Sequence, residues 1–159
     1  MWPSSEMSEP MNIDGPAPGA PADPADLHCA GVPAEPRQLS RLRHRLVQWA
    51  ARTALSADQS EALVLATYEA LANTAAHAYP DGTGVVDLRA SYQPDSRSVE
   101  VTVTDHGQWR PPPEERDGLG GRGLVLIRNM TDHTAVDSGP AGTRVTMRWN
   151  LERATAPTV

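Results

Sequence analysis

The sequence predicts a two-layer α/β sandwich, an α+β fold in which helices cover one face of a mostly antiparallel mixed sheet. Two observations predict this fold. Apolar residues recur at helical spacing between Pro36 and Pro80, and from Val86 onward they alternate with polar residues at the period of a strand. Helices and hairpins that each have one apolar face can bury those faces against one another in two layers.

The length and charge of the chain limit its possible functions. The 159 residues suffice for one domain with a hydrophobic core. All fourteen basic residues are arginine, so the chain has neither a P-loop lysine nor the strand lysine of eukaryotic-type protein kinases. The formal net charge is -6, and outside the acidic first 26 residues the acidic and basic residues nearly balance. Because a nucleic-acid binder needs a basic excess, we expect no nucleic acid as a partner.

The remaining composition indicates a soluble protein. A single cysteine, Cys29, excludes an intrachain disulfide. No apolar stretch is long enough to span a membrane and the N-terminus lacks a signal pattern, so we expect a cytoplasmic protein without a membrane partner. Three segments are expected: a disordered acidic tail rich in proline and alanine over 1–26, a folded domain over 27–152 and a flexible C-terminus over 153–159.

The first half of the domain is expected to hold one short strand and two helices. Leu27–Gly31 is expected to form an edge strand. An amphipathic helix is expected over Pro36–Thr53, because four apolar residues recur on one face: Leu39, Leu42, Leu46 and Trp49. Ser56 and Gln59 have the spacing of a capping box, so a second helix should begin at Ser56 and end before the turn at 80–82. Its buried stripe is expected to consist of Val64, Tyr68, Leu71 and Ala75.

The second half is expected to hold two hairpins. Apolar residues alternate with polar ones over Val86–Tyr92 and over Val99–Val103, on either side of a turn at 94–96. A second hairpin should consist of Thr134–Ser138 and Val145–Leu151, joined by a glycine turn. These four strands, with the edge strand, would complete the sheet.

Two patterns indicate a nucleotide and metal site. Glu69 and Asn73 are four residues apart, so a helix places them on one face. Residues 106–120 are expected to form a loop, and the sequence Gly-Gly-Arg-Gly at 120–123 leads from it into a short helix over Leu124–Met130. A glycine turn at a helix start presents free backbone N–H groups, which suit phosphate.

The chain resembles the ATP-binding domain shared by gyrase-type ATPases, histidine kinases and the bacterial anti-sigma-factor serine kinases, and the last branch fits best. The resemblance covers roughly Leu27 to Leu151 and implies a Bergerat-type ATP-binding fold. Four motifs carry it in order: Glu69-Ala-Leu-Ala-Asn73 is similar to the asparagine box, Asp105-His106-Gly107 to the first glycine box, Gly120-Gly121-Arg122-Gly123 to the second, and Gly142-Thr143 to the last.

The resemblance implies that the chain binds ATP and Mg²⁺. Asn73 would hold the Mg²⁺ through its side-chain oxygen, a hard ligand for a hard ion, and Glu69 would act as general base toward an attacking hydroxyl. Asp105 would accept a hydrogen bond from the adenine amine, beside Gly107, and Thr143 would support the same end of the site. Taken alone, the Glu69–Asn73 pair would be a solvated helix face and Thr143 an ordinary strand residue; the four motifs together favour the ATP site.

The second glycine box is implied to form the phosphate end of the site. Gly121 and Gly123 would let the backbone wrap the phosphates, with Leu124 following in the helix. Arg116 and Arg122 are candidate phosphate contacts, because a guanidinium binds phosphate through paired charged hydrogen bonds. For each of these two arginines an ordinary surface position is an equal alternative.

One segment departs from the family pattern. The fuller first glycine box has a second glycine two residues after the first, and this chain has Trp109 there, followed by Pro111-Pro112-Pro113. Because proline restricts the backbone, these residues stiffen what is often a mobile lid.

The resemblance implies an anti-sigma-factor-type ATP-binding protein with serine/threonine kinase activity. Such a protein would phosphorylate a small anti-sigma-factor antagonist and sequester a sigma factor, regulating transcription by partner switching, and homodimers are usual in this branch. The alternative is a partner-switch module that binds ATP without kinase activity. A third interpretation, a histidine-kinase catalytic domain, requires a dimerising helical region with a phosphoacceptor histidine, and the N-terminal tail has no such helical pattern.

Overall fold

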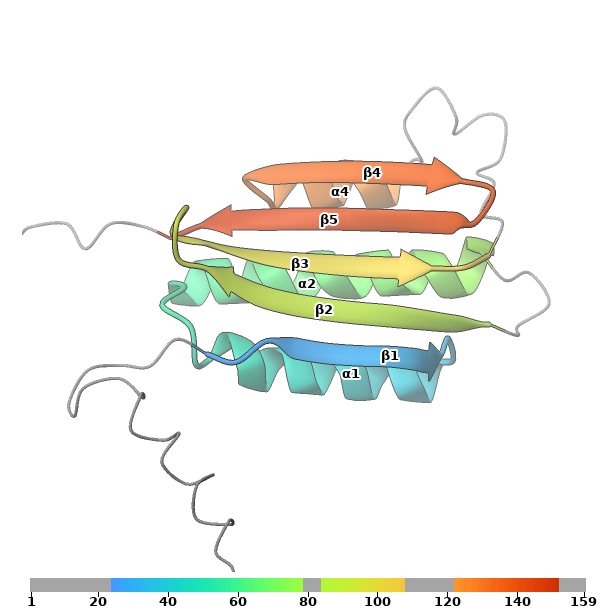
Figure 1. Cartoon of the computed structure of the whole chain (residues 1–159), viewed down its shortest axis with the longest axis horizontal. Helices are drawn as coiled ribbons and strands as arrows, with labels where there is room; N and C mark the ends of the chain where they lie inside the picture. The colour runs from blue at the N-terminus through green and yellow to red at the C-terminus, as the bar shows by residue number, and fades with distance from the viewer. Residues whose placement is uncertain (1–23, 79–83, 108–121, 152–159) are drawn as a thin grey trace, which may run out of the picture.

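The computed structural model describes residues 24–78, 84–107 and 122–151. Within these ranges, five strands form one sheet in the order β1-β2-β3-β5-β4, and every neighbouring pair is antiparallel. The α-helices α1, α2 and α4 lie on one face of the sheet, and no described helix covers the other face (Figure 1). The predicted two-layer α+β fold is confirmed, although the expected mixed pairing does not occur among the described strands.

Helix α1 (Pro36–Ala50) forms where the sequence predicts an amphipathic helix. Its predicted core residues are all buried: Leu39, Leu42, Leu46 and Trp49. The helix ends three residues before the predicted end at Thr53. The reason is that the N–H groups of Arg52 and Thr53 bond to carbonyls three residues back, which is the tighter 3₁₀ pattern, rather than four.

Helix α2 (Ala57–Asn73) begins with the predicted capping box. The Ser56 hydroxyl accepts a hydrogen bond from the Gln59 backbone N–H at 3.1 Å, and the Gln59 side-chain oxygen accepts one from the Ser56 N–H at 3.0 Å. The helix buries a wider face than the predicted stripe, because it lies on the sheet between α1 and α4 (Figure 1). Its buried residues are Leu63, Val64, Ala66, Thr67, Ala70 and Leu71, while the predicted Tyr68 and Ala75 are only partly buried.

The strands carry the predicted alternation. β1 (Leu27–Pro33) is an edge strand, and β2 (Val85–Gln93) pairs with β3 (Ser98–Asp105) as the predicted hairpin. β4 (His133–Gly139) and β5 (Gly142–Asn150) form the second hairpin. The apolar positions of β2 and β3 are buried under the helices: Val86, Leu88, Ala90, Val99, Val101 and Val103. β5 pairs with β3 in the middle of the sheet and thereby joins the two hairpins.

Helix α4 (Arg122–Asn129) corresponds to the predicted short helix over Leu124–Met130. It packs through Leu124 and Ile127, which are buried, whereas the two residues between them are about half exposed. With only these two buried side chains, α4 has the smallest apolar contact of the described α-helices.

The folded part extends to the N-terminal side of β1. The Trp49 indole N–H donates a hydrogen bond to the Ala25 carbonyl at 2.7 Å, and Asp26 forms an ion pair with Arg89 at 3.0 Å. Ala25 and Asp26 both lie in the segment 1–26, and these two bonds join them to α1 and β2. Residues 1–23 and 152–159 lie outside the described residues. Among the described helices, none is long and apolar enough to cross a membrane.

Candidate functional site

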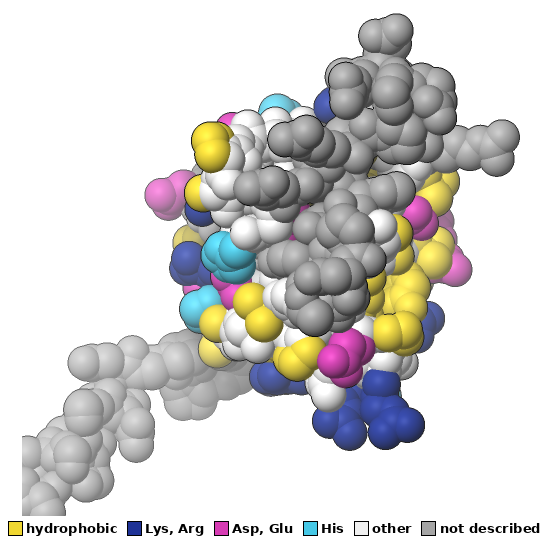
Figure 2. Space-filling model, turned by 90° about the vertical axis from the view of Figure 1, so that its right-hand side faces the viewer, with side chains coloured by type: hydrophobic (Ala, Val, Ile, Leu, Met, Phe, Trp, Pro, Cys, Tyr) yellow, Lys and Arg dark blue, Asp and Glu magenta, His cyan; other side chains and the backbone are white. Residues whose placement is uncertain are grey.

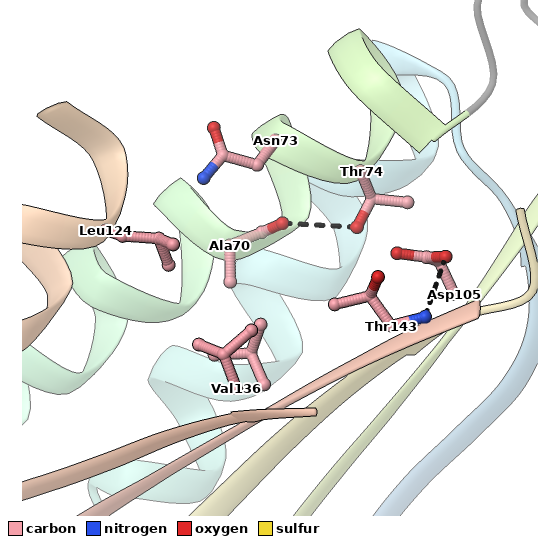
Figure 3. A pocket seen from close by; sticks show the side chains of 8 residues that line it. Ala70, Asn73, Thr74, Asp105, Leu124, Val136 and Thr143 are labelled. Atoms are coloured by element: carbon pink, nitrogen blue, oxygen red, sulfur yellow. Dashed lines mark hydrogen bonds between the residues drawn. The ribbon is translucent and has the colours of Figure 1, made fainter. Parts of the chain in front are cut away.

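One pocket lies where the C-terminal end of α2 faces the sheet and the start of α4 (Figure 3). Apolar side chains form most of its wall, and a few polar groups converge on it, which is typical of small-molecule sites. Its lining residues are Ala70, Asn73, Thr74, Asp105, Leu124, Val136, Thr143 and Val145. The fold thus brings four predicted site residues from distant parts of the chain to one pocket: Asn73, Asp105, Leu124 and Thr143.

Asp105 is held rigidly at the sheet side of the pocket. It is the last residue of β3, and only 5% of it is exposed. Its Oδ1 atom accepts hydrogen bonds from the backbone N–H groups of Gly107 at 3.0 Å and Thr143 at 3.2 Å. Burial raises the pKa of the Asp105 carboxyl above its ordinary value, although these two hydrogen bonds and nearby His106 act in the opposite direction. No described residue donates to Oδ2, which leaves this oxygen as an acceptor for a ligand.

The last predicted motif supports Asp105 mainly through its backbone. Gly142 has a φ of +134°, and a Cβ at this position would lie 2.0 Å from the Asp105 carbonyl oxygen, so only glycine fits so close to β3. Thr143 is opposite Asp105 in the register of β3 and β5. Its N–H bonds to the Asp105 carboxylate, while its hydroxyl lies 2.8 Å from the hydroxyl of Ser138.

Asn73 lies at the opposite side of the pocket, against the first turn of α4. A Cβ at Gly123 would lie 2.8 Å from Asn73 Nδ2 and 3.1 Å from Asn73 Oδ1, closer than an unstrained contact permits. The absence of a side chain at Gly123 therefore leaves the space that the Asn73 amide occupies. This contact joins the predicted asparagine box to the predicted second glycine box.

Glu69 does not line the pocket. It lies one helical turn before Asn73 on the same face of α2 and is half-buried. Its expected role as general base stays a prediction.

The structure also identifies pocket residues that the sequence reasoning missed. Thr74 follows Asn73 directly and is 5% exposed, and its hydroxyl donates a hydrogen bond to the Ala70 carbonyl at 3.2 Å. Val136 and Val145 form apolar walls from β4 and β5. Thr74 could have been predicted as a site residue because it follows Asn73 in the sequence. Val136 and Val145 could not, because only the pairing of β4 with β5 brings them to the pocket.

The remaining predicted site residues are only partly described. The backbone N–H of Gly107 donates a hydrogen bond to Asp105 Oδ1. Arg122 begins α4, but its side chain is not among the described ones. Arg116 and Gly121 lie outside the described residues, so their phosphate contacts stay predictions.

A second set of charged residues lies beside the site on the face of the sheet that no described helix covers. His106 Nε2 is 2.9 Å from Asp87 Oδ2, and the other oxygen of Asp87 accepts a hydrogen bond from the Gly31 N–H at 2.8 Å. Burial acts to raise the pKa of the Asp87 carboxyl, but the bonds from Gly31 and His106 outweigh it and hold this pKa below its ordinary value. These contacts tie β1, β2 and the end of β3 together. Histidine and charged side chains gather at the left of Figure 2.

The residues of the pocket fit a nucleotide with a divalent metal ion. A buried carboxylate with one unmatched oxygen suits a donor such as an exocyclic amine. The amide oxygen of Asn73 suits Mg²⁺, and the first turn of α4 begins beside it, where helix N–H groups suit phosphate. The donors and acceptors therefore match the two ends of a metal-bound nucleotide.

Comparison with known proteins gives one family over most of the chain. Residues 32–149 match the family model described as histidine kinase-like ATPase domain. A search of the curated proteins found no match.

Several solved structures share the fold. The RsbU and RsbW domains of Rv1364c from Mycobacterium tuberculosis are 23% identical, with a TM-score of 0.66 over 85% of this chain and 35% of that chain. The histidine kinase domain of the Erythrobacter litoralis EL346 blue-light activated histidine kinase is 24% identical, with a TM-score of 0.53 over 90% and 69%. The SiaB-SiaC complex from Pseudomonas aeruginosa is 12% identical, with a TM-score of 0.57 over 77% and 88%.

These identities are low, so the likeness to solved structures shows the fold. This chain spans about a third of the Rv1364c chain that it matches. The family model, in contrast, covers the sheet and helices that form the pocket, together with all four motifs. The chain belongs to the family of histidine kinase-like ATPase domains.

Proposed function

We propose that the chain binds MgATP in this pocket and acts as an anti-sigma-factor-type serine/threonine kinase on a small antagonist protein. The observation that carries the proposal is the convergence of Asn73 and Asp105 on one pocket beside the start of α4. Membership of an ATPase-domain family supports ATP as the ligand.

The two ends of the pocket would bind different parts of the nucleotide. Asp105 Oδ2 would accept a hydrogen bond from the amine of the base, with the carboxylate held by two backbone N–H groups. Asn73 would bind Mg²⁺ through its amide oxygen, as one of the few protein ligands this ion usually takes. When bound, MgATP would supply the phosphoryl group for transfer.

Glu69 is the proposed general base. It lies on the face of α2 that carries Asn73, is half-buried and does not line the pocket. Accepting the proton of an attacking hydroxyl would strengthen that hydroxyl as a nucleophile. In this proposal the carboxylate acts on the acceptor hydroxyl and not on the nucleotide.

Glu69→Gln tests this role, because it keeps the shape of the side chain and removes its basicity. Phosphate transfer to the purified antagonist should fall by roughly 10²–10⁴-fold, while MgATP affinity measured by calorimetry stays nearly unchanged. Glu61→Gln is the matched control, since Glu61 is exposed on the same helix two turns earlier. Transfer at the wild-type rate by the Glu69→Gln protein would rule out Glu69 as the base.

A specific observation favours the alternative, an ATP-binding partner-switch module without kinase activity. Glu69 is only half-buried and does not line the pocket, whereas a catalytic base is usually held in place by a third group. Incubation of the wild-type protein with labelled ATP and the antagonist distinguishes the two functions. Label on serine or threonine supports the kinase, and tight ATP binding without any transfer supports the module.

The proposed partners are a sigma factor and its antagonist, with a homodimer as the proposed assembly. A protein partner agrees with one structure of similar fold, which was solved as the SiaB-SiaC complex. Affinity purification from the native host followed by mass spectrometry tests the partners. Light scattering of the purified chain tests the dimer.

A further inference from the structure

Thr74 places a hydroxyl group inside the pocket, between Asn73 and Asp105. The residue is 5% exposed and lines the pocket together with both of them. In Figure 3, Thr74 extends from the end of α2 toward the side of the pocket where Asp105 lies. No motif includes this residue, so its contribution comes from the structure alone.

While it donates to the Ala70 carbonyl, the Thr74 hydroxyl is an acceptor toward a ligand. Its hydrogen is used in the bond to the Ala70 carbonyl at 3.2 Å, and that carbonyl cannot donate in return. The lone pairs of Oγ1 remain available on the pocket side. A bond of this kind to the carbonyl four residues back is common for threonine in helices, and here it fixes the direction of the hydroxyl.

The backbone changes its helical pattern at this residue. α2 ends at Asn73, and a single π-helical turn, η2 (Thr74–Ala78), begins at Thr74. Its N–H group is shared between the carbonyls of Ala70 and Leu71. Such π turns occur frequently at functional sites, where they redirect side chains from the regular helical positions.

Two acceptors therefore face the same space from opposite elements: Thr74 Oγ1 from the helix layer and Asp105 Oδ2 from the sheet. An amino group at the six position of a purine has two N–H bonds and can donate to both, directly or through one water. Guanine has a carbonyl oxygen at this position, which two acceptors would repel. We propose that Thr74 is a specificity-determining residue that recognises the six-amino group of the base together with Asp105. This inference rests on the proposed nucleotide binding.

The test compares ATP with purine riboside triphosphate, which has hydrogen in place of the six-amino group. Thr74→Val keeps the branched shape and removes the hydroxyl. We expect this variant to bind ATP about three- to tenfold more weakly by calorimetry, the worth of one hydrogen bond, and to bind the analogue within about twofold of wild type. Thr74→Ser, which keeps the hydroxyl, should retain the preference for ATP.

Thr67→Val is the matched control. Thr67 is a fully buried threonine in α2 and does not line the pocket. Its replacement should leave the affinities for both nucleotides unchanged. Should Thr74→Val fold poorly, Thr74→Ala gives the same comparison, because the ratio of the two affinities does not depend on the folded fraction.

Three results would overturn the inference. Equal losses for ATP and the analogue would mean that Thr74 acts through packing and not through the amine. Wild-type ATP affinity in both Thr74→Val and Thr74→Ala would mean that the hydroxyl does not contact the base. Failure of folded wild-type protein to bind either nucleotide would overturn the proposed function itself, and is distinguishable from the first two results because it appears before any substitution.

Discussion

Replacing Gly123 by alanine should weaken nucleotide binding without destabilising the protein. Gly123 has no positive φ and lies in the first turn of α4, so alanine suits its backbone. Alanine is favoured over glycine in helices by up to about 1 kcal/mol. The added methyl group, however, would lie 2.8 Å from Asn73 Nδ2, where an ordinary contact begins at 3.4 Å.

The magnitude follows from this contact. The Asn73 amide must retreat by about 0.6 Å, and it can do so because it is the far end of a flexible side chain. The free energy of unfolding should therefore stay the same or rise. Mg²⁺ demands ligands close to ideal octahedral positions, and disturbing the support of a metal ligand typically costs about 10- to 100-fold in metal affinity.

The assay is a titration of MgATP by calorimetry alongside a thermal melt of each variant. Gly139→Ala is the control, because a Cβ at Gly139 would meet no atom within 4 Å. We expect Gly123→Ala to lose about 10- to 100-fold in Mg²⁺-dependent ATP affinity and Gly139→Ala to lose none. Wild-type affinity in a Gly123→Ala protein with an unchanged melting temperature would refute the role given to the Asn73 contact.

Further predictions follow from other contacts. Asp105→Asn should lower ATP affinity by on the order of 1.5–3 kcal/mol and affect GTP less, measured by calorimetry; equal losses would show that Asp105 does not read the base. Because burial raises the pKa of Asp105 in the folded state, ionisation of this carboxyl lowers the free energy of unfolding at neutral pH. This loss disappears as the pH falls through the folded pKa. The Asp105→Asn protein should therefore lack this acid-dependent rise in melting temperature, measured by thermal melts at several pH values. Thr67→Val should raise the free energy of unfolding by about 1 kcal/mol in urea titrations, because the buried Thr67 hydroxyl has no hydrogen-bond partner among the described residues; a loss would contradict this. Deleting 1–23 should leave the melting temperature unchanged, whereas deleting 1–26 should lower it by removing the bond from Trp49 to Ala25; identical melts for both would show that this bond contributes nothing.

Local patterns were sufficient to predict the elements of this fold. The capping box at Ser56, the helical spacing in α1 and the alternation in β2 and β3 each depend on neighbours within a few residues, and each is confirmed. The ends of elements were less predictable, because the 3₁₀ turn after α1 and the π turn after α2 depend on how the chain leaves the helix layer.

The candidate site could be predicted only where a motif marks it. Asn73 and Asp105 each belong to a predicted motif, and the fold brings both side chains to one pocket. Val136 and Val145 have no motif and are recognised only because β5 lies between β3 and β4. The contact between Asn73 and Gly123 also depends on tertiary packing, since it brings the end of α2 against the start of α4.

The walls of the pocket differ in how firmly they are held, and this difference bears on how a nucleotide enters. The pocket has a volume of about 20 Å³, which is room for a water molecule and not for a purine. Asp105, Thr143, Val136 and Val145 belong to paired strands, and Ala70 belongs to the central helix. Leu124 belongs to α4, in which two of the described side chains are buried. Elements with few buried contacts open at the lowest cost in free energy, so the pocket should widen by movement of α4 away from α2. Recognition of the base would then depend on Asp105 and Thr74, which do not belong to α4, and metal binding on the position of α4.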